Sequence, residues 1–417
     1  MASSPQLFAF SLLLFISLSK AALQQPKSLF LPISKDPSSL QYIAHLHLGT
    51  PLKSRNFVLD VGGRYLWMNC ESRYNSSTYK PGRCGSPPCL AAKVSDCAYC
   101  YSTPPKPGCS TNTCILNPKN TITGVAASEE LSTDVVSFKS TAHTKTNVPR
   151  FIFSCSRVGL LEGLPRGASG MVGLGRTTIS LPSQLSTPKF ALCLPPKIKS
   201  KGVVIFGNPP YAFYPPYNKK KSIDLQFSYT KLYNNPVHPS AEYLIGVTGI
   251  TIDKKHIPIS PALLSINNKG DGGTKISTIV PYTVLESSIY NGLKQAFSKG
   301  VQAMNVSKVA PVAPFTECFS TEFLGYTPTG PFVPEIGFVF ENKEMYWELY
   351  GVNSMVEISR KVVCLAFVDG GAGPRTSIVI GSHQLQDNVV EFDLAASRVG
   401  FSRDLLNAHA GCDGFRF

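Results

Sequence analysis

Short apolar runs separated by turn residues recur along the whole chain. Examples are YIAHLHLG (42–49), RFIFSCS (150–156), GVVIFGN (202–208) and SIVIGS (377–382). These runs are rich in β-branched and aromatic residues, and Gly, Pro, Asn or Ser bounds most of them. Their lengths are typical of strands and too short for most helices. The pattern therefore predicts a mostly β protein with a strand at each run.

The pattern also repeats approximately between the two halves of the chain. SGMVGLG (169–175) is an apolar pair closed by glycines, and TSIVIGS (376–382) has the same form. Upstream of each lies a second apolar strand, in NFVLDVGG (56–63) and in GGTKISTIVPYTVL (272–285). Each half therefore predicts the same unit, a strand that ends in a loop and a second strand that supports it.

A chain of 417 residues is long enough to bury two cores. We place the N-terminal lobe at residues 22–210 and the C-terminal lobe at residues 211–417. The junction falls in the proline- and lysine-rich segment around residues 208–222.

The N-terminus has the features of a secretory signal. Its apolar core, residues 7–18, is too short to span a bilayer, and the small-residue pattern Ser-Lys-Ala follows it. We predict cleavage after residues 1–21 and a secreted protein without a membrane anchor. The sequons at Asn75 and Asn305 suit a secreted glycoprotein.

Secretion determines how the 12 cysteines are interpreted, because an even number in an oxidising compartment predicts six disulfides. Six of them crowd into one stretch: Cys84, Cys89, Cys97, Cys100, Cys109 and Cys114. The spacing of Cys97 and Cys100 also occurs in zinc sites, but this stretch has no histidine and several prolines. We predict a loop that is held by disulfides and binds no metal. The sequence does not determine which of its cysteines pair.

Composition and charge narrow the classes of partner. A chain with 43% hydrophobic and 16% charged residues is not disordered. A net charge of +14 favours acidic partners. The basic residues are dispersed, apart from the run 219–221, and no nucleic-acid-binding motif accompanies them. An acidic cell-wall polysaccharide or an acidic protein is therefore a better candidate than nucleic acid.

The stretch FVLDVGGRYLW (57–67) resembles the active-site strand of pepsin-like aspartic peptidases. That mechanism needs two carboxylates about 3 Å apart that share one proton. The register of the second half places Ser277 where the second aspartate is expected, and Asp271 lies before the strand. Val61 also lacks the hydroxyl usual after the first aspartate. We therefore predict that Asp60 is a relic without peptidase activity, and we expect no cofactor.

Nearly the whole mature chain resembles a plant group within the pepsin-like superfamily. The group comprises extracellular dermal glycoproteins, basic 7S globulins, xyloglucanase-inhibiting proteins and TAXI-type xylanase inhibitors. The resemblance rests on FVLDVGGRYLWMNCESRYNSSTY, GGTKISTIVPYTVLESSIYNGLKQAF, VCLAFVDGGAGPRTSIVIGSHQLQDN and EFDLAASRVGFS. It implies a mostly β, bilobal fold with a disulfide-rich insert in the N-terminal lobe. It also implies three disulfides: Cys70 with Cys155, Cys193 with Cys412, and Cys318 with Cys364.

The resemblance further implies a secreted defence protein that blocks the clefts of microbial endoglucanases or xylanases. A retaining glycosidase holds two carboxylates about 5 to 5.5 Å apart, and a planar guanidinium can bind carboxylates bidentately. Arg375, between Pro374 and Thr376 in a Gly- and Pro-rich loop, is the best candidate for that role. Tyr326 and Phe332 are candidate apolar anchors on a second loop, which lacks the basic residue that the resemblance leads us to expect.

Two other functions remain open at the level of sequence. A storage or peptide-binding globulin of the basic 7S type should accumulate in seed and be cut between the lobes. An atypical aspartic peptidase should cleave protein at acid pH. An inhibitor should instead stay intact in the apoplast or cell wall.

Overall fold

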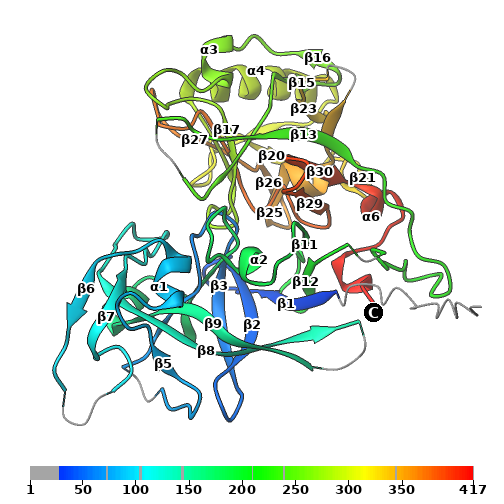
Figure 1. Cartoon of the computed structure of the whole chain (residues 1–417). Helices are drawn as coiled ribbons and strands as arrows, with labels where there is room; N and C mark the ends of the chain where they lie inside the picture. The colour runs from blue at the N-terminus through cyan, green and yellow to red at the C-terminus, as the bar shows by residue number, and fades with distance from the viewer. Residues whose placement is uncertain are drawn as a thin grey trace, which may run out of the picture.

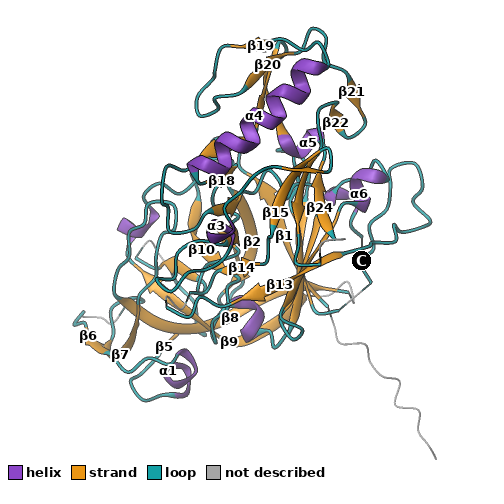
Figure 2. Ribbon diagram, turned by 90° about the horizontal axis from the view of Figure 1, so that it is seen from above, coloured by secondary structure: helices purple, strands orange, loops and turns teal. Residues whose placement is uncertain are grey.

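The computed structural model describes residues 28–416, apart from 72–73, 103–105, 142–144, 209, 238–239 and 343–344. The predicted signal, residues 1–21, lies outside the described residues. Figure 1 shows two lobes, the lower one formed by the N-terminal half in blue to teal and the upper one by the C-terminal half. Strands far outnumber helices in both lobes (Figure 2), as the sequence predicts.

The N-terminal half consists of twelve strands and three short helical segments within the described residues. The strands are β1 (Leu29–Lys35), β2 (Tyr42–Leu48), β3 (Lys53–Asp60), β4 (Trp67–Asn69), β5 (Lys80–Pro81), β6 (Cys97–Tyr99), β7 (Thr111–Leu116), β8 (Glu129–Ser140), β9 (Lys145–Ser156), β10 (Ala168–Gly173), β11 (Lys189–Cys193) and β12 (Gly202–Phe206). The helical segments are α1 (Pro87–Ala92), η1 (Val158–Leu161) and α2 (Leu181–Gln184).

The C-terminal half contains eighteen strands and one long helix among its described residues. The strands are β13 (Ser228–Tyr233), β14 (Tyr243–Ile245), β15 (Gly249–Ile252), β16 (Lys255–His256), β17 (Thr274–Ile276), β18 (Thr283–Leu285), β19 (Lys308–Val309), β20 (Cys318–Ser320), β21 (Tyr326–Thr327), β22 (Gly330–Pro331), β23 (Ile336–Val339), β24 (Tyr346–Leu349), β25 (Met355–Ser359), β26 (Val362–Leu365), β27 (Phe367–Asp369), β28 (Ile378–Ile380), β29 (Val389–Asp393) and β30 (Arg398–Ser402). The helical segments are α3 (Pro261–Leu264), α4 (Ser287–Ala303), α5 (Gly351–Ser354), α6 (Asp404–Asn407) and η2 (Cys412–Gly414).

A continuous sheet joins the two lobes. Strand β11 of the first half pairs with β29 near the end of the chain, and β29 continues through β30 to β13. On this sheet the rings of Phe190 and Phe392 stack with centroids 4.6 Å apart, and Tyr243 packs against Phe392 at the same distance. The Tyr243 hydroxyl also donates to the carbonyl of Leu174 at 2.7 Å. Aromatic packing therefore fixes one lobe against the other.

The repeat seen in the sequence is a repeat of structure. Strands β3 and β10 are parallel, with Asp60 level with Gly173. In the second half β17 and β28 are parallel, with Ile276 level with Ile380, so that Gly381 follows beside Ser277. A Cβ atom on Gly173 would lie 2.4 Å from the carbonyl oxygen of Gly63, and one on Gly381 would lie 2.3 Å from backbone of the adjacent loop. Only glycine permits this close approach.

All twelve cysteines lie among the described residues, and they pair as six disulfides. Three are the pairs that the resemblance implies: Cys70–Cys155, Cys193–Cys412 and Cys318–Cys364. The insert pairs internally as Cys84–Cys97, Cys89–Cys114 and Cys100–Cys109. Cys97 and Cys114 face each other across β6 and β7 yet join different partners, because Cys114 is buried with Cys89 while Cys97 lies at the surface.

Both predicted glycosylation sites lie at the surface of the protein. Asn75 and Asn305 are both exposed, so their sequons are accessible, and their glycosylation stays a prediction. Within the described part of the chain, no helix has the length and apolar character needed to cross a membrane.

Candidate functional site

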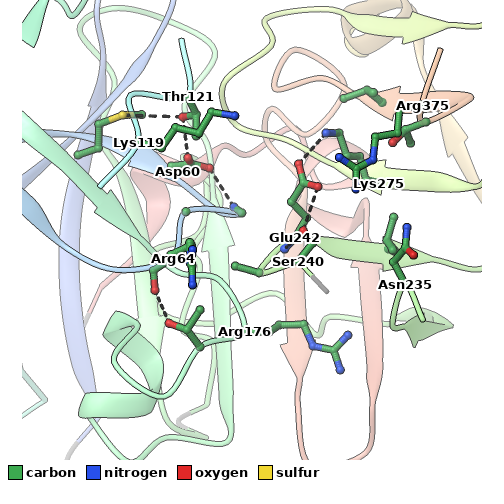
Figure 3. Close-up of a pocket in the computed structure, with 18 of the residues that line it drawn as sticks. Asp60, Arg64, Lys119, Thr121, Arg176, Asn235, Ser240, Glu242, Lys275 and Arg375 are labelled. Atoms are coloured by element: carbon green, nitrogen blue, oxygen red, sulfur yellow. Dashed lines mark hydrogen bonds and ion pairs between the residues drawn. The ribbon is translucent and has the colours of Figure 1, made fainter. Parts of the chain in front are cut away.

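A cleft of about 720 Å³ lies between the lobes and is lined by residues from both. The first half contributes the loops after β3, β7 and β10. The second half contributes residues around β14 and β17 and the loop between β27 and β28. Figure 3 shows Asp60 and Thr121 on one side of this cleft and Glu242, Lys275 and Arg375 on the other.

Asp60 lies at the end of β3, with only 5% of its surface exposed. The amide of Gly62 donates to its Oδ1 at 3.0 Å, and the hydroxyl of Thr121 donates to its Oδ2 at 2.7 Å. Burial raises the pKa of Asp60, and these two hydrogen bonds only partly oppose that shift. The carboxyl group of Asp60 therefore stays protonated to higher pH than an ordinary aspartic acid does.

Across the lobe interface, Thr278 binds the backbone on both sides of Asp60. Its hydroxyl accepts from the amide of Val61 at 3.0 Å and donates to the carbonyl of Leu59 at 2.7 Å. The neighbouring Ser277 accepts from two amides of its own turn, at 3.1 and 3.3 Å. Val61 has no hydroxyl, so its side chain cannot form a matching hydrogen bond to the backbone of the second lobe. Of Val61 and Thr278, only Thr278 therefore contributes a hydroxyl to this contact.

Thr121 is a site residue that the sequence did not reveal. It lies in the loop between β7 and β8, and its hydroxyl reaches Asp60 across 61 positions of sequence. A threonine in a polar loop has no distinguishing spacing or motif. Only the folded chain shows that its hydroxyl satisfies the buried carboxyl group.

Five cationic side chains line the cleft: Arg64, Lys119, Arg176, Lys275 and Arg375. Lys275 forms an ion pair with Glu242 at 2.6 Å. Burial alone would raise the pKa of Glu242, but the charge and hydrogen bond of Lys275, together with Ser240 and Arg375, lower it overall. The ionised form of Glu242 is therefore favoured. Among the described residues, the other four cations form no ion pair.

The loop that carries Arg375 is held at its base and open at its tip. The carbonyl of Arg375 accepts from the amide of Gly272 at 2.9 Å, and that of Ser377 accepts from Glu286 at 2.8 Å. Gly371 and Gly373 adopt φ angles of 82° and 64°, which favour glycine. Arg375 is exposed and lines the cleft together with its neighbours Pro374 and Thr376.

Tyr326 and Phe332 lie elsewhere on the C-terminal lobe. They belong to the region of the β21–β22 hairpin, and their exposed fractions are 52% and 57%. Tyr326 lines a separate hollow of about 420 Å³ that shares no lining residue with the Arg375 cleft. The structure therefore brings Arg375, Pro374 and Thr376 together with Asp60, but it does not add the two aromatic residues to that cleft.

The residues of the cleft do not suggest a metal centre. Within the described residues, no three His, Cys, Asp or Glu side chains are grouped so that they could hold an ion. The chemistry that the cleft can offer comes from one buried carboxyl group, one carboxylate paired with lysine, and a set of cations.

Two β lobes, each with a parallel strand pair that supports a central loop, define the pepsin-like fold. The crystal structure of the aspartic proteinase from Irpex lacteus shares this fold, with a TM-score of 0.55 and 14% identity over 90% of this chain and 97% of that chain. The chain is therefore an aspartic-proteinase-like protein in fold.

The family follows from the sequence matches. The chain matches the family described as xylanase inhibitor N-terminal over residues 42–208 and the one described as xylanase inhibitor C-terminal over residues 242–403. Together the matches cover most of both lobes. The chain belongs to this xylanase-inhibitor family.

Its relatives have names of different kinds. It is 47% identical to "Probable aspartic proteinase GIP2" of Nicotiana benthamiana, over 100% of this chain and 99% of that protein. The crystal structure of edgp matches with a TM-score of 0.90 and 46% identity, over 94% of this chain and 98% of that one. Basic 7S globulin from soybean matches with a TM-score of 0.80 and 34% identity, over 93% and 99%.

Proposed function

We propose that this protein is a secreted, catalytically inactive homologue of aspartic peptidases that inhibits microbial cell-wall-degrading glycoside hydrolases. The observation that carries the proposal is the match of both lobes to the xylanase-inhibitor family. The six disulfides fit an oxidising extracellular compartment such as the apoplast. The target class is an endoglucanase or a xylanase, and the role is plant defence.

Arg375 is the proposed inhibitory residue. Its guanidinium presents paired donors that match the paired carboxylates of a glycosidase cleft. The backbone of its loop is fixed at both ends by hydrogen bonds, so little conformational entropy is lost when a partner binds. Pro374 and Thr376 flank the contact, while Tyr326 and Phe332 supply a second, apolar contact outside the cleft.

An inhibition assay tests this function directly. Purified mature protein at micromolar concentration should lower the activity of at least one secreted microbial endoglucanase or xylanase, in competition with its polysaccharide substrate. The same samples should yield a stable complex by size-exclusion chromatography. Full activity of a broad panel of both enzyme classes, without complex formation, would contradict the proposal.

The proposed lack of peptidase activity rests on the lobe interface. The contacts of Thr278 with Leu59 and Val61 support placing Ser277 opposite Asp60, where a second carboxylate would be needed. A single carboxyl group cannot act as both the base that activates water and the acid that polarises the carbonyl.

We therefore expect no pepsin-like proteolysis between about pH 3 and 6, the range in which an intact carboxylate pair works. Asp60→Asn should leave this null result unchanged. Ser277→Asp alone should not create activity, because Val61 still lacks the hydroxyl that is usual after the first aspartate. The assay is cleavage of a casein-type substrate. Acid proteolysis that a statine inhibitor blocks and Asp60→Asn abolishes would overturn the proposal.

A storage function of the basic 7S type is the second candidate, because the soybean globulin covers nearly the whole chain. Between β12 and β13 the described residues contain no helix or strand, and the exposed residues 219–221 there are lysines. We place the lobe boundary at residues 210 and 211 within this segment. Protein isolated from its tissue as two disulfide-linked chains would favour storage, whereas an intact chain favours inhibition.

A further inference from the structure

The cleft between the lobes is rich in positive charge, although a working peptidase of this fold holds a pair of carboxylates there. Five positive side chains and two carboxyl groups line it. Figure 3 shows Lys119 and Arg64 on one wall and Lys275 and Arg375 on the other, so the charges face one space from both lobes. The cleft volume of about 720 Å³ falls within the range of about 300 to 1,000 Å³ that is usual for ligand pockets.

The charge of Glu242 attracts Arg375, but among the described residues neither carboxyl group forms an ion pair with any of the four cations other than Lys275. Asp60 lies at the base of the cleft, where Thr121 and Gly62 bind both of its oxygens. Glu242 binds Lys275 at 2.6 Å and accepts from Ser240 at 3.0 Å. Like charges that converge on one cleft repel each other, and the low-dielectric walls strengthen the field. An anion in the cleft would relieve that repulsion.

The other lining groups indicate the chemistry of that anion. The largest apolar side chains of the cleft, Tyr65, Trp67 and Met171, are buried, and the partly exposed apolar residues of the lining are smaller: Val284, Pro374 and Val379. Hydroxyl and amide side chains accompany the cations instead: Asn117, Thr121, Asn235, Ser240 and Thr376. Such groups suit a ligand that carries many hydroxyl groups as well as several carboxylates.

We propose that the interlobe cleft binds a short linear chain of uronic acids. Arg64 and Arg375 bind carboxylates through planar, bidentate contacts from opposite walls, and Lys119 adds a compact charge. Glu242 holds Lys275 in place through their ion pair. This binding site goes beyond inhibition of a hydrolase, because it requires no protein partner and uses cations on both lobes.

The test is isothermal titration of the full mature chain with tri-galacturonic acid at low salt. We expect saturable binding, and we expect the methyl ester of the same trimer to bind at least about tenfold more weakly, since the ester removes the carboxylates. Raising the salt concentration should also weaken binding severalfold, because salt screens exposed charges. Equal binding of the ester, or no binding of the acid, would overturn the proposal.

Charge-reversal variants locate the site. Arg64→Glu with Lys119→Glu should weaken binding by about tenfold or more, because each exposed attraction becomes a repulsion. The matched control, Lys219→Glu with Lys220→Glu, changes the net charge equally in an exposed loop outside the cleft lining, and should weaken binding less than about twofold. Both variants should keep the unfolding temperature of the natural chain. An equal loss in both would show general charge attraction and refute the site.

An acidic peptide is the competing occupant, and oligo-glutamate with three carboxylates tests it. The uronic acid trimer should bind more tightly, because its hydroxyl groups also meet the polar side chains of the cleft. Tighter binding of oligo-glutamate would overturn the assignment. No hydrolase is present in these titrations, so their failure and the failure of the proposed inhibition are distinguishable.

Discussion

Arg375→Ala is expected to weaken binding to a confirmed glycoside hydrolase target by roughly 2 to 5 kcal/mol, the usual effect of removing one partner from a desolvated charge pair. The loss should appear mainly as faster dissociation of the complex. The physical reason is that the paired carboxylates of the target would remain buried without a cation. Inhibition constants and surface plasmon resonance measure the two effects separately.

Two further variants make this result specific. Arg375→Lys should recover only part of the affinity, because an ammonium group lacks the planar pair of donors. Arg166→Ala removes an exposed arginine outside the cleft lining and should leave inhibition unchanged. Inhibition should also weaken as the pH falls through the pKa of the target's nucleophilic carboxylate, since protonation removes the charge that Arg375 meets. Equal inhibition constants for Arg375→Ala and the natural protein would move the contact to residues 321–334.

Phe392→Ala is expected to lower the free energy of unfolding by about 3 to 5 kcal/mol, as large truncations of buried phenylalanine do. Phe392 is fully buried and contacts the rings of both Phe190 and Tyr243 on the sheet that joins the lobes. The cavity would therefore open between the lobes rather than inside one of them. Urea unfolding followed by fluorescence or circular dichroism measures the change.

Phe323→Ala is the control for this prediction, because 70% of Phe323 is exposed. Its effect should stay within about 0.5 kcal/mol, as for most surface substitutions. A loss below about 1 kcal/mol for Phe392→Ala would show that the interlobe contact stabilises far less than its burial indicates. In a double variant with Phe190→Ala, the two losses should add incompletely, since the rings share one contact.

The cleft and the lobe interface together suggest how a peptidase scaffold can serve binding instead of hydrolysis. The proposed change removes one carboxylate at Ser277 and leaves Asp60 buried and bound by Thr121. Cations from several loops then make the same cleft attractive to anions. Each of these changes leaves the supporting strands β3, β10, β17 and β28 intact.

The sequence by itself determined the features that local patterns encode. Short apolar runs, rich in β-branched and aromatic residues and bounded by turn residues, predicted the strands. The apolar pair followed by glycine marked the strands that support both central loops, because only glycine fits at Gly173 and Gly381. The even number of cysteines behind a signal-like N-terminus predicted six disulfides.

The tertiary structure alone decided which distant residues meet. The insert disulfides depend on which cysteines the α1 segment and the β6–β7 hairpin bury, and their spacing in sequence does not encode that choice. The cationic cleft draws Arg64, Lys119, Arg176, Lys275 and Arg375 from separate segments, none of which is basic enough to stand out by itself. Tyr326 and Phe332 were grouped with Arg375 as candidates, yet they lie outside its cleft. The contacts between the lobes arise when strands pair across hundreds of residues, so no local pattern can reveal them.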